Sequence, residues 1–393
     1  MSARCCTAAT GRSSARRSCA PRRAPRRAIR SGPSSTKSAT SLPSLPSPAP
    51  PSSGASASRW AWIVGLAVTL GLLAWALHGV DAGELVGHVR RADPLLLLVA
   101  VALATLTFPL RAVRWRLILR DVGGARFPLG PLWHATAIGF MANNLLPARA
   151  GEFARAYVAQ QRLPVRFSTA LASIGVERVF DGLLLVGLMM LAIASPAFPR
   201  HAQIGTTSVS GLATGAAVVF AAVLGLAFLV VHRPAPWLAL LRRVTHAVLP
   251  ARFGERLIRV AEGLVAGLEV LKSPGRFLGV VGWSVVQWLV NAAAFAVCFR
   301  AFGLAVPAEG AFLLQGIIGL GVALPASPGF VGVFEAATRV TLAIYGIDAT
   351  RAVSYAVAYH VATFLPITLM GLYSLSRLRL HLAELRAAAA TAA

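Results

Sequence analysis

Acidic residues are scarce in this chain. Only 14 of its 393 residues are Asp or Glu, against 38 Lys or Arg; charged residues make up 13% of the sequence and hydrophobic residues 56%. So little charge argues against an ordinary soluble domain and favours a polytopic membrane protein. The four cysteines show no metal-binding spacing, and Cys5, Cys6 and Cys19 fall near the start. The sequence contains no P-loop or other nucleotide motif, so we predict no metal and no cofactor.

The first 59 residues differ from the rest of the chain. They hold ten arginines and Lys37 but no acid, so +11 of the formal charge of +24 lies there. A basic tail can bind nucleic acid, but richness in Ser, Pro and Arg is more typical of a disordered leader, and we predict no nucleic-acid partner. The tail lacks the apolar core of a secretory signal. It resembles an organelle transit peptide, and a start codon placed too far upstream explains it equally well.

Apolar runs of about 20 residues, the length that crosses a bilayer, recur along the remaining chain. Full spans are predicted at 60–78, 94–112, 168–194, 209–231, 277–301 and 352–375. Two further runs, near 131–146 and 310–345, are interrupted by Pro, Gly and polar residues, which is tolerated only where protein or water covers the backbone. We therefore predict an all-α polytopic membrane domain at 60–380 with six full spans and two re-entrant broken-helix hairpins. A short Ala-rich tail, 381–393, follows it.

Arginines indicate the orientation. They collect in 111–126, 149–166, 232–276 and after 376, whereas the opposite loops 195–208 and 302–309 hold only Arg200. The positive-inside rule makes the arginine-rich side cytoplasmic, with both termini, in the cell inner membrane. Arg90 and Arg91 are exceptions. Region 232–276 alternates apolar and charged residues at helical spacing, which predicts helices along the headgroup surface or, alternatively, a soluble hairpin.

The two broken segments share a short motif. Leu-Pro-Ala-x-x-Gly occurs at 146–151 and at 324–329, 178 residues apart, and the spans before and after it recur 182 residues apart. The predicted orientation makes the two units, about 94–194 and 277–375, cross in opposite senses. Such an inverted-topology repeat is typical of secondary transporters. Half-helix ends that meet near the midplane can hold an anionic group.

Charged and polar residues at the breaks and inside the spans are the candidate substrate-binding residues. The asparagines before the first break can bind a ligand or cap freed carbonyls, and the charges after it can pair along one helix face, as in an ordinary cytoplasmic loop. Three charges within the span 168–194 each cost about 2.5–3.5 kcal/mol to insert. The predicted set is Asn143, Asn144, Arg149, Glu152, Arg155, Glu177, Arg178, Asp181, Ser327, Glu335 and His360.

Several members of this set have two predicted roles. We expect Arg178 to pair with Glu177 or Asp181 and to share a substrate phosphate, unless the three form only a structural ion pair. Glu335, followed by Arg339 four residues later, is a gate residue or half of a structural pair. The intramembrane His360 is a proton carrier or a hydrogen-bonded packing residue.

A further group of basic and aromatic residues follows the second span. Arg111, Arg114 and Trp115 lie at its predicted cytoplasmic end. Arginine and tryptophan are common at the membrane interface, so we predict that these three anchor the chain to anionic headgroups. Collecting a lipid phosphate is the second choice.

These motifs resemble the flippase-like membrane domain of the lysylphosphatidylglycerol synthase transmembrane family. The resemblance rests on Arg111-x-x-Arg114-Trp115, "NNLLPARAGEFARAY", "ERVFDGL" and "LPASPGFVGVFE", in this order within about 60–380. It implies an integral membrane protein that moves a lipid-linked molecule between leaflets. Family members that make aminoacylated lipid carry a soluble transfer domain for which this sequence has no room, so we expect no lysyl-lipid synthesis. Archaeal relatives tied to glycan assembly keep lipid-linked sugars among the candidate substrates.

Three functions follow from these residues. The first is translocation or scrambling of an anionic phospholipid or lipid-linked intermediate, without catalysis. The second is a polytopic transferase acting on a polyprenyl-phosphate-linked sugar, which usually needs clustered carboxylates for a metal. The third is a membrane scaffold. The expected partners are membrane lipids, with a second copy of the chain or a separate lipid-modifying enzyme as further candidates.

Overall fold

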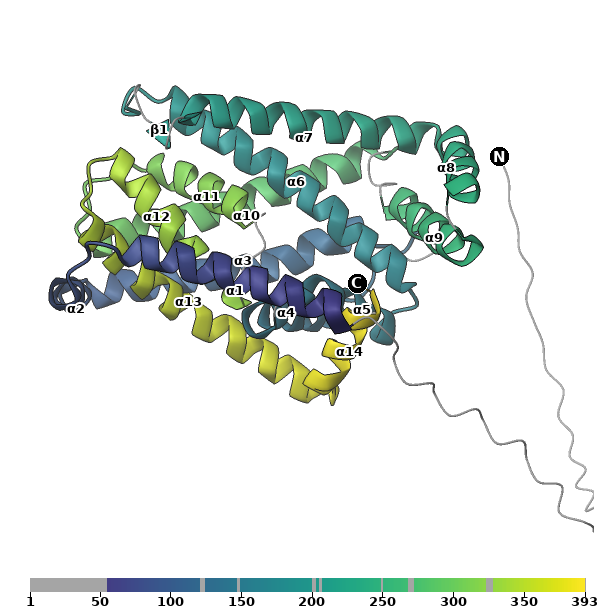
Figure 1. The fold of residues 1–393 in the computed structure, drawn as a ribbon, viewed down its shortest axis with the longest axis horizontal. Coiled ribbons are helices and arrows are strands. Elements are labelled where there is room, and N and C mark those ends of the chain that lie inside the picture. Colours follow the sequence, from purple (N-terminus) through teal and green to yellow (C-terminus); the bar gives the residue numbers. More distant parts are fainter. Residues whose placement is uncertain are drawn as a thin grey trace, which may run out of the picture. The chain divides into compact units, whose positions relative to one another are not determined.

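A computed structural model describes residues 55–120, 124–146, 149–199, 203–204, 207–248, 250–267, 272–322 and 328–392. They lie in one unit of the chain, Ser52–Ala393. Apart from one pair of two-residue strands, the regular structure described is helical (Figure 1). The predicted tail before residue 55, the motif residues 147–148 and 324–326, and Ser327 fall outside the described residues.

The helices follow the apolar runs closely. Their bounds are α1 Ala55–Leu77, α2 Ala82–Arg91, α3 Pro94–Ile118, α4 Leu129–Leu145, α5 Ala150–Arg162, α6 Phe167–Ala194, α7 Val209–His232, α8 Pro234–Val248, α9 Ala251–Gly267, α10 Pro274–Ala301, α11 Gly310–Gly321, α12 Val333–Ile344, α13 Ala349–Leu378 and α14 Leu382–Ala392. The strands are β1 Gln203–Ile204 and β2 Thr207–Ser208, and Pro328–Phe330 forms a 3-10 turn, η2.

Among the described residues, three helices are long and apolar enough to cross a membrane: α3, α10 and α13. A fourth crossing results if α1 and α2, bent by 81° at a short break, count as one. Helix α6 has 28 residues, but Glu177, Arg178 and Asp181 interrupt its apolar run. The structure therefore contains a helix at each of the six predicted spans. By length and composition alone, three or four of the described helices could cross a membrane.

Aspartates mark where several helices begin. The Asp93 carboxylate accepts hydrogen bonds from the N–H groups of Leu95 and Leu96, and Pro94 occupies the first turn of α3. Asp81 caps α2 and Asp348 caps α13 in the same way. Side-chain caps satisfy amides that have no partner within the helix, so these starts are local properties of the sequence.

Helices α3 and α10 pack against one another in opposite directions. The Asp93 N–H, before α3, donates to the Ala301 carbonyl at the end of α10 (2.9 Å). At the other end, Arg276 donates from the first turn of α10 to the Leu117 carbonyl of α3 (3.3 Å). We call these two ends of the bundle the Asp93 end and the Arg276 end.

Helices α4 and α5 form a hairpin whose two outer ends lie at the Arg276 end. Arg116, in the last turn of α3, donates to the Phe127 carbonyl just before α4 (2.8 Å). Arg162, at the end of α5, donates to the Leu378 carbonyl at the end of α13. The hairpin therefore enters the bundle and returns on the same side.

Helices α11 and α12 form a second hairpin, which starts and finishes at the Asp93 end. Glu309, before α11, accepts a hydrogen bond from Ser195 at the end of α6. Tyr345, after α12, lies beside Gly310, and α13 begins four residues later. The two hairpins meet at their tips, because a Cβ added to Gly329 would lie 3.7 Å from the Asn144 carbonyl oxygen.

Glycines allow the first hairpin to close tightly. A Cβ on Gly151 of α5 would lie 2.0 Å from the Gly139 carbonyl oxygen of α4, and a Cβ on Gly371 of α13 would lie 2.1 Å from the Met141 side chain. Real atoms do not approach this closely, so the helices cross here only because these side chains are missing. The hairpin is thereby held close to both α6 and α13.

Apolar side chains cover the outside of the bundle. Leu95 and Leu98 of α3, Leu278 of α10, and Leu365 and Leu369 of α13 are all more than half exposed. An apolar surface of this kind marks contact with lipid or with another protein. It agrees with the composition of these helices.

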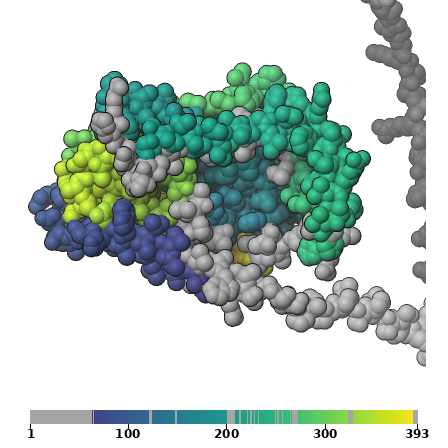
Figure 2. Space-filling view, turned by 45° about the horizontal axis from the view of Figure 1, so that its top comes forward, coloured from purple at the N-terminus to yellow at the C-terminus, as the bar shows by residue number. Residues whose placement is uncertain are grey.

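Region 232–276 forms the helix pair α8 and α9, which lies at one end of the face shown in Figure 2. Arg242 and Glu262 join the two helices through an ion pair of 2.9 Å. Gly263 of α9 lies against Ser168 of α6. The expected helices are present, and their position along the headgroups stays a prediction.

Candidate functional site

A buried ion-pair network joins three helices of the bundle. Glu177 of α6, which is fully buried, accepts two hydrogen bonds from the Arg155 guanidinium of α5 (2.9 and 3.1 Å). It also contacts Arg114 of α3 at 3.0 Å and its own neighbour Arg178 at 2.9 Å. A buried carboxylate without such partners would destabilise the fold strongly. Glu177 therefore links α3, α5 and α6.

Asp181, one turn further along α6, extends the network toward α10. Arg114 donates to both of its carboxylate oxygens, and Arg178 lies 3.4 Å away. The Trp288 indole N–H of α10 donates to Asp181 at 2.8 Å. Arg114 also donates to the Ser284 hydroxyl of the same helix at 3.1 Å. The network thus joins both members of the antiparallel pair α3 and α10.

The network contains more positive than negative charge. Three buried guanidinium groups, those of Arg111, Arg114 and Arg155, surround two buried carboxylates, those of Glu177 and Asp181, which leaves a balance of +3 − 2 = +1. Arg178 and Glu152, 4.0 Å apart and 39% and 33% exposed, add one charge of each sign at the edge of the network. Uncompensated charge is costly in a low-dielectric interior, so the network favours a bound anion.

Arg111 has the fewest partners among these arginines. Its guanidinium lies over the rings of Phe140 and Trp288, 5.1 and 5.2 Å from their centroids, and 3.7 Å from Asp181. Its Nε and Nη1 donate no hydrogen bond to any residue that the structure describes, although the side chain is only 9% exposed. Arg111 therefore keeps two unpaired but buried donors beside Phe140, whose ring lines the pocket described next.

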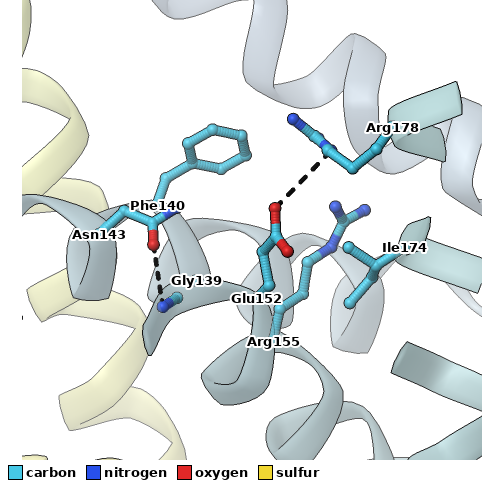
Figure 3. Close-up of a pocket in the computed structure, with 8 residues that line it drawn as sticks. Gly139, Phe140, Asn143, Glu152, Arg155, Ile174 and Arg178 are labelled. Atoms are coloured by element: carbon cyan, nitrogen blue, oxygen red, sulfur yellow. Dashed lines mark hydrogen bonds and ion pairs between the residues drawn. The ribbon is translucent and has the colours of Figure 1, made fainter. Parts of the chain in front are cut away.

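A small pocket of about 20 Å³, room for about one water molecule, lies beside the network. Figure 3 shows Glu152 and Arg178 facing one another across it, with the Phe140 ring alongside. Two of the four network arginines, Arg155 and Arg178, belong to its wall. The lining residues are Gly139, Phe140, Asn143, Gly151, Glu152, Arg155, Ile174 and Arg178.

The break between α4 and α5 positions this wall. Arg149 precedes α5 in a left-handed conformation (φ 54°), which is uncommon outside glycine. The Asn143 side-chain oxygen accepts the Gly151 N–H at 2.9 Å, and Asn144 donates to Thr368 of α13 at 3.1 Å. Asn143 thus caps a freed amide instead of the predicted carbonyl, and Asn144 faces α13.

The predicted pairing of Arg149, Glu152 and Arg155 along one helix face is replaced by contacts with α6. Glu152 faces Arg178 and Arg155 binds Glu177, because α5 packs against α6. The structure brings Asn143, Glu152, Arg155 and Arg178 together around the cavity and places Glu177 and Asp181 behind it. The binding role of these residues stays a prediction.

The headgroup-anchoring role predicted for Arg111, Arg114 and Trp115 is wrong for the side-chain positions observed. Arg114 and Trp115 are fully buried and Arg111 nearly so. Trp115 donates to Ser173 at 2.8 Å, and the Arg155 guanidinium lies 3.9 Å from its ring centroid. These side chains turn inward because the carboxylates of α6 attract them. Sequence reasoning also missed Ser284 and Trp288. Nothing in the sequence marks these two residues except that each has a polar group within an apolar run.

A second polar cluster lies at the break of the other hairpin. His360 of α13 contacts the Glu335 carboxylate at 2.7 Å and the Gly329 carbonyl at 2.9 Å. The predicted pair of Glu335 and Arg339 is wrong. Arg339 instead donates to three carbonyls at the end of α1, including that of Trp75, because the last carbonyls of a helix lack partners and attract cations.

Together, these helices and this network define a polytopic integral membrane protein. Residues 62–371 match the family described as "Lysylphosphatidylglycerol synthase TM region". The chain belongs to this family, as the motifs around Arg111, Asn143 and Glu177 led us to expect.

Curated relatives agree with the family. A protein of Haloferax volcanii named "Glycosyltransferase AglD" is 31% identical over 310 residues, which are 72% of this chain and 48% of that protein. The chain therefore spans about half the length of this relative. Two proteins of Methanothermobacter thermautotrophicus, each named "UPF0104 membrane protein", are 26% and 24% identical over 74% of this chain and cover 85% and 88% of their own lengths.

Proposed function

We propose that this protein translocates or scrambles an anionic phospholipid or a lipid-linked intermediate between the two leaflets, without catalysing a reaction on it. The single observation that carries the proposal is the excess of buried positive charge beside the cavity. A phosphate is the common anionic group of such lipids, and paired arginine donors match its oxygens. Arg178, which lines the pocket and is partly exposed, is the residue proposed to bind it, with Asn143, Glu152 and Arg155 shaping the site and Arg111 behind Phe140.

The proposed topology has six full spans and two re-entrant hairpins, arranged as an inverted repeat. The opposite directions of α3 and α10, and the entry of the two hairpins from opposite ends, support this arrangement. Polar backbone at the breaks is then covered by protein and never meets lipid. Two half-helix pairs that meet between repeats are the usual site of substrate binding in transporters.

The Arg276 end is the proposed cytoplasmic side of the inner membrane, with both termini. The regions richest in arginine, including 232–276, lead to this end. The proposed partners are anionic or lipid-linked membrane lipids, with a second copy of the chain or a separate lipid-modifying enzyme as further candidates. Energy would come from an ion or lipid gradient, or exchange would be passive.

Headgroup exposure in reconstituted vesicles tests the proposal. Labelled phosphatidylglycerol on both leaflets is bleached from outside, and the fraction bleached rises as inner lipid reaches the surface. We expect exchange with wild type and its loss with Arg178→Gln, whose side chain is 39% exposed and so tolerates replacement. Arg242→Gln is the matched control, because Arg242 makes an exposed ion pair of the same length, 2.9 Å. Equal exchange for wild type and Arg178→Gln would contradict the proposal.

The name of the haloarchaeal relative favours a transferase as the second candidate. A transferase acting on a polyprenyl-phosphate-linked sugar would use the same arginines to bind the phosphate. Purified protein incubated with such a donor, with and without Mg²⁺ or Mn²⁺, separates the two functions. Metal-dependent turnover without leaflet exchange would favour the transferase.

A further inference from the structure

The two contacts of the His360 imidazole determine where its protons lie. The imidazole Nε2 lies 2.9 Å from the Gly329 carbonyl oxygen. A carbonyl oxygen only accepts hydrogen bonds, so Nε2 must carry a hydrogen. The imidazole Nδ1 lies 2.7 Å from a carboxylate oxygen of Glu335. A second proton must lie between these two atoms, because otherwise two acceptors would face one another at hydrogen-bond distance.

We propose that His360 and Glu335 form a proton-binding site that controls the break of the second hairpin. The pair holds one proton more than a neutral imidazole and a carboxylate would hold separately. Whether that proton lies on nitrogen or on oxygen, the pair is neutral as a unit. Loss of the proton leaves a carboxylate that is 96% buried facing a lone pair.

The pair holds the hairpin break through two backbone contacts. Glu335 accepts the Gly332 N–H with its other oxygen at 2.6 Å, which fixes the start of α12. His360 holds the carbonyl of Gly329, a residue with a left-handed backbone (φ 71°). Gly329 in turn lies against Asn144 of the first hairpin. Release of the shared proton removes the bond between the two side chains and leaves a buried carboxylate facing a lone pair, which is unfavourable. We propose that the two side chains then separate and carry Gly332 and Gly329 apart.

The groups around His360 leave Glu335 as its titratable partner. Within the described residues, Glu335 on α12 is the charged side chain that contacts the imidazole, and the ring of Phe334 lies 4.8 Å from it. Arg339, one turn further along α12, is directed at the carbonyls of α1. On α4, His134 bonds to Ser374. The arginines of α3 face Asp181, as described above.

Hydrogen exchange in wild type tests the proton site without any transport measurement. We expect the protection of the Gly332 amide, corrected for the intrinsic pH dependence of exchange, to fall about tenfold or more as pH rises and the shared proton leaves. The fall would come from opening of this segment and not from a weaker hydrogen bond, because a carboxylate accepts an N–H at least as strongly as a neutral carboxyl group does. The Gly151 amide is the internal control, because it also donates to a side-chain oxygen at a hairpin break, but to Asn143, which does not titrate.

Two variants complete the test. His360→Gln places an amide N–H donor beside Glu335 at every pH, so its Gly332 protection should not fall as pH rises, whereas His134→Gln should keep the wild-type profile. A constant Gly332 protection in wild type, or an equal fall at Gly151, would overturn the proposal. Any coupling of this proton to lipid movement rests on the proposed function. Vesicles with an imposed pH gradient test that coupling separately. If wild type showed no lipid exchange between leaflets but did show the predicted pH dependence of Gly332 hydrogen exchange, only the proposed function would be refuted.

Discussion

Replacing Glu177 by glutamine tests whether the buried network holds the bundle together. Glu177 is fully buried and contacts Arg114, Arg155 and Arg178. Glutamine keeps the shape and one acceptor oxygen but removes the negative charge. The buried arginines Arg111, Arg114 and Arg155 then face Asp181 alone, and the buried charge rises from +1 to +2. We expect a loss of about 3–5 kcal/mol in the free energy of unfolding, the range for a buried pair that loses one partner.

This loss is large compared with the stability of a typical protein, about 5–15 kcal/mol. Denaturant unfolding of the detergent-solubilised protein measures it. Glu262→Gln is the matched control, because the Glu262 carboxylate also pairs with an arginine at 2.9 Å but its side chain is 42% exposed. Exposed pairs contribute about 0–1 kcal/mol. If Glu177→Gln cost no more than Glu262→Gln, the ion pairs of α6 would not be buried as the structure has them, and the excess charge beside the cavity would lose its basis.

Two further predictions concern contacts that position the hairpins. Gly151→Ala should destabilise the protein by about 1–3 kcal/mol or more in the same assay, because the added Cβ would lie 2.0 Å from the Gly139 carbonyl oxygen. Gly175→Ala is the control, because a Cβ at Gly175 would meet open space. An equal loss of stability in the two variants would contradict the close crossing of α4 and α5. Arg339→Gln should lower the hydrogen-exchange protection at the end of α1, where the Trp75, Ala76 and His78 carbonyls all lose the Arg339 donor. Unchanged protection would refute these contacts.

The helices and their breaks could be predicted because they depend on local sequence. Runs of about 20 apolar residues become helices wherever the backbone leaves water, and Asp93 stands directly before the span predicted at 94–112. The interrupted runs near 146 and 325 gave the two hairpins. The predicted set also contained the charged residues of the pocket wall, Glu152, Arg155 and Arg178, because a charge in an apolar segment is costly and must serve structure or function.

The partners of these charges could not be predicted in the same way. Arg114 and Asp181 are 67 residues apart in the chain, and the sequence around Arg114 reads equally well as an interfacial anchor. The pairing of Glu335 with Arg339 was suggested by helical spacing, but the free carbonyls of α1 and the imidazole of His360 lie closer in space. Long-range competition of this kind decides which partner each side chain takes.

The sequence by itself determined the membrane class, the family, the helix positions and the places where helices break, because each depends on composition or on neighbours along the chain. Only the tertiary structure decided that α3 contributes two arginines to the carboxylates of α6, and that His360 closes onto Glu335. Electrostatic energy depends on distance in space and on the exclusion of water, and both are set only when helices that are distant in sequence pack together.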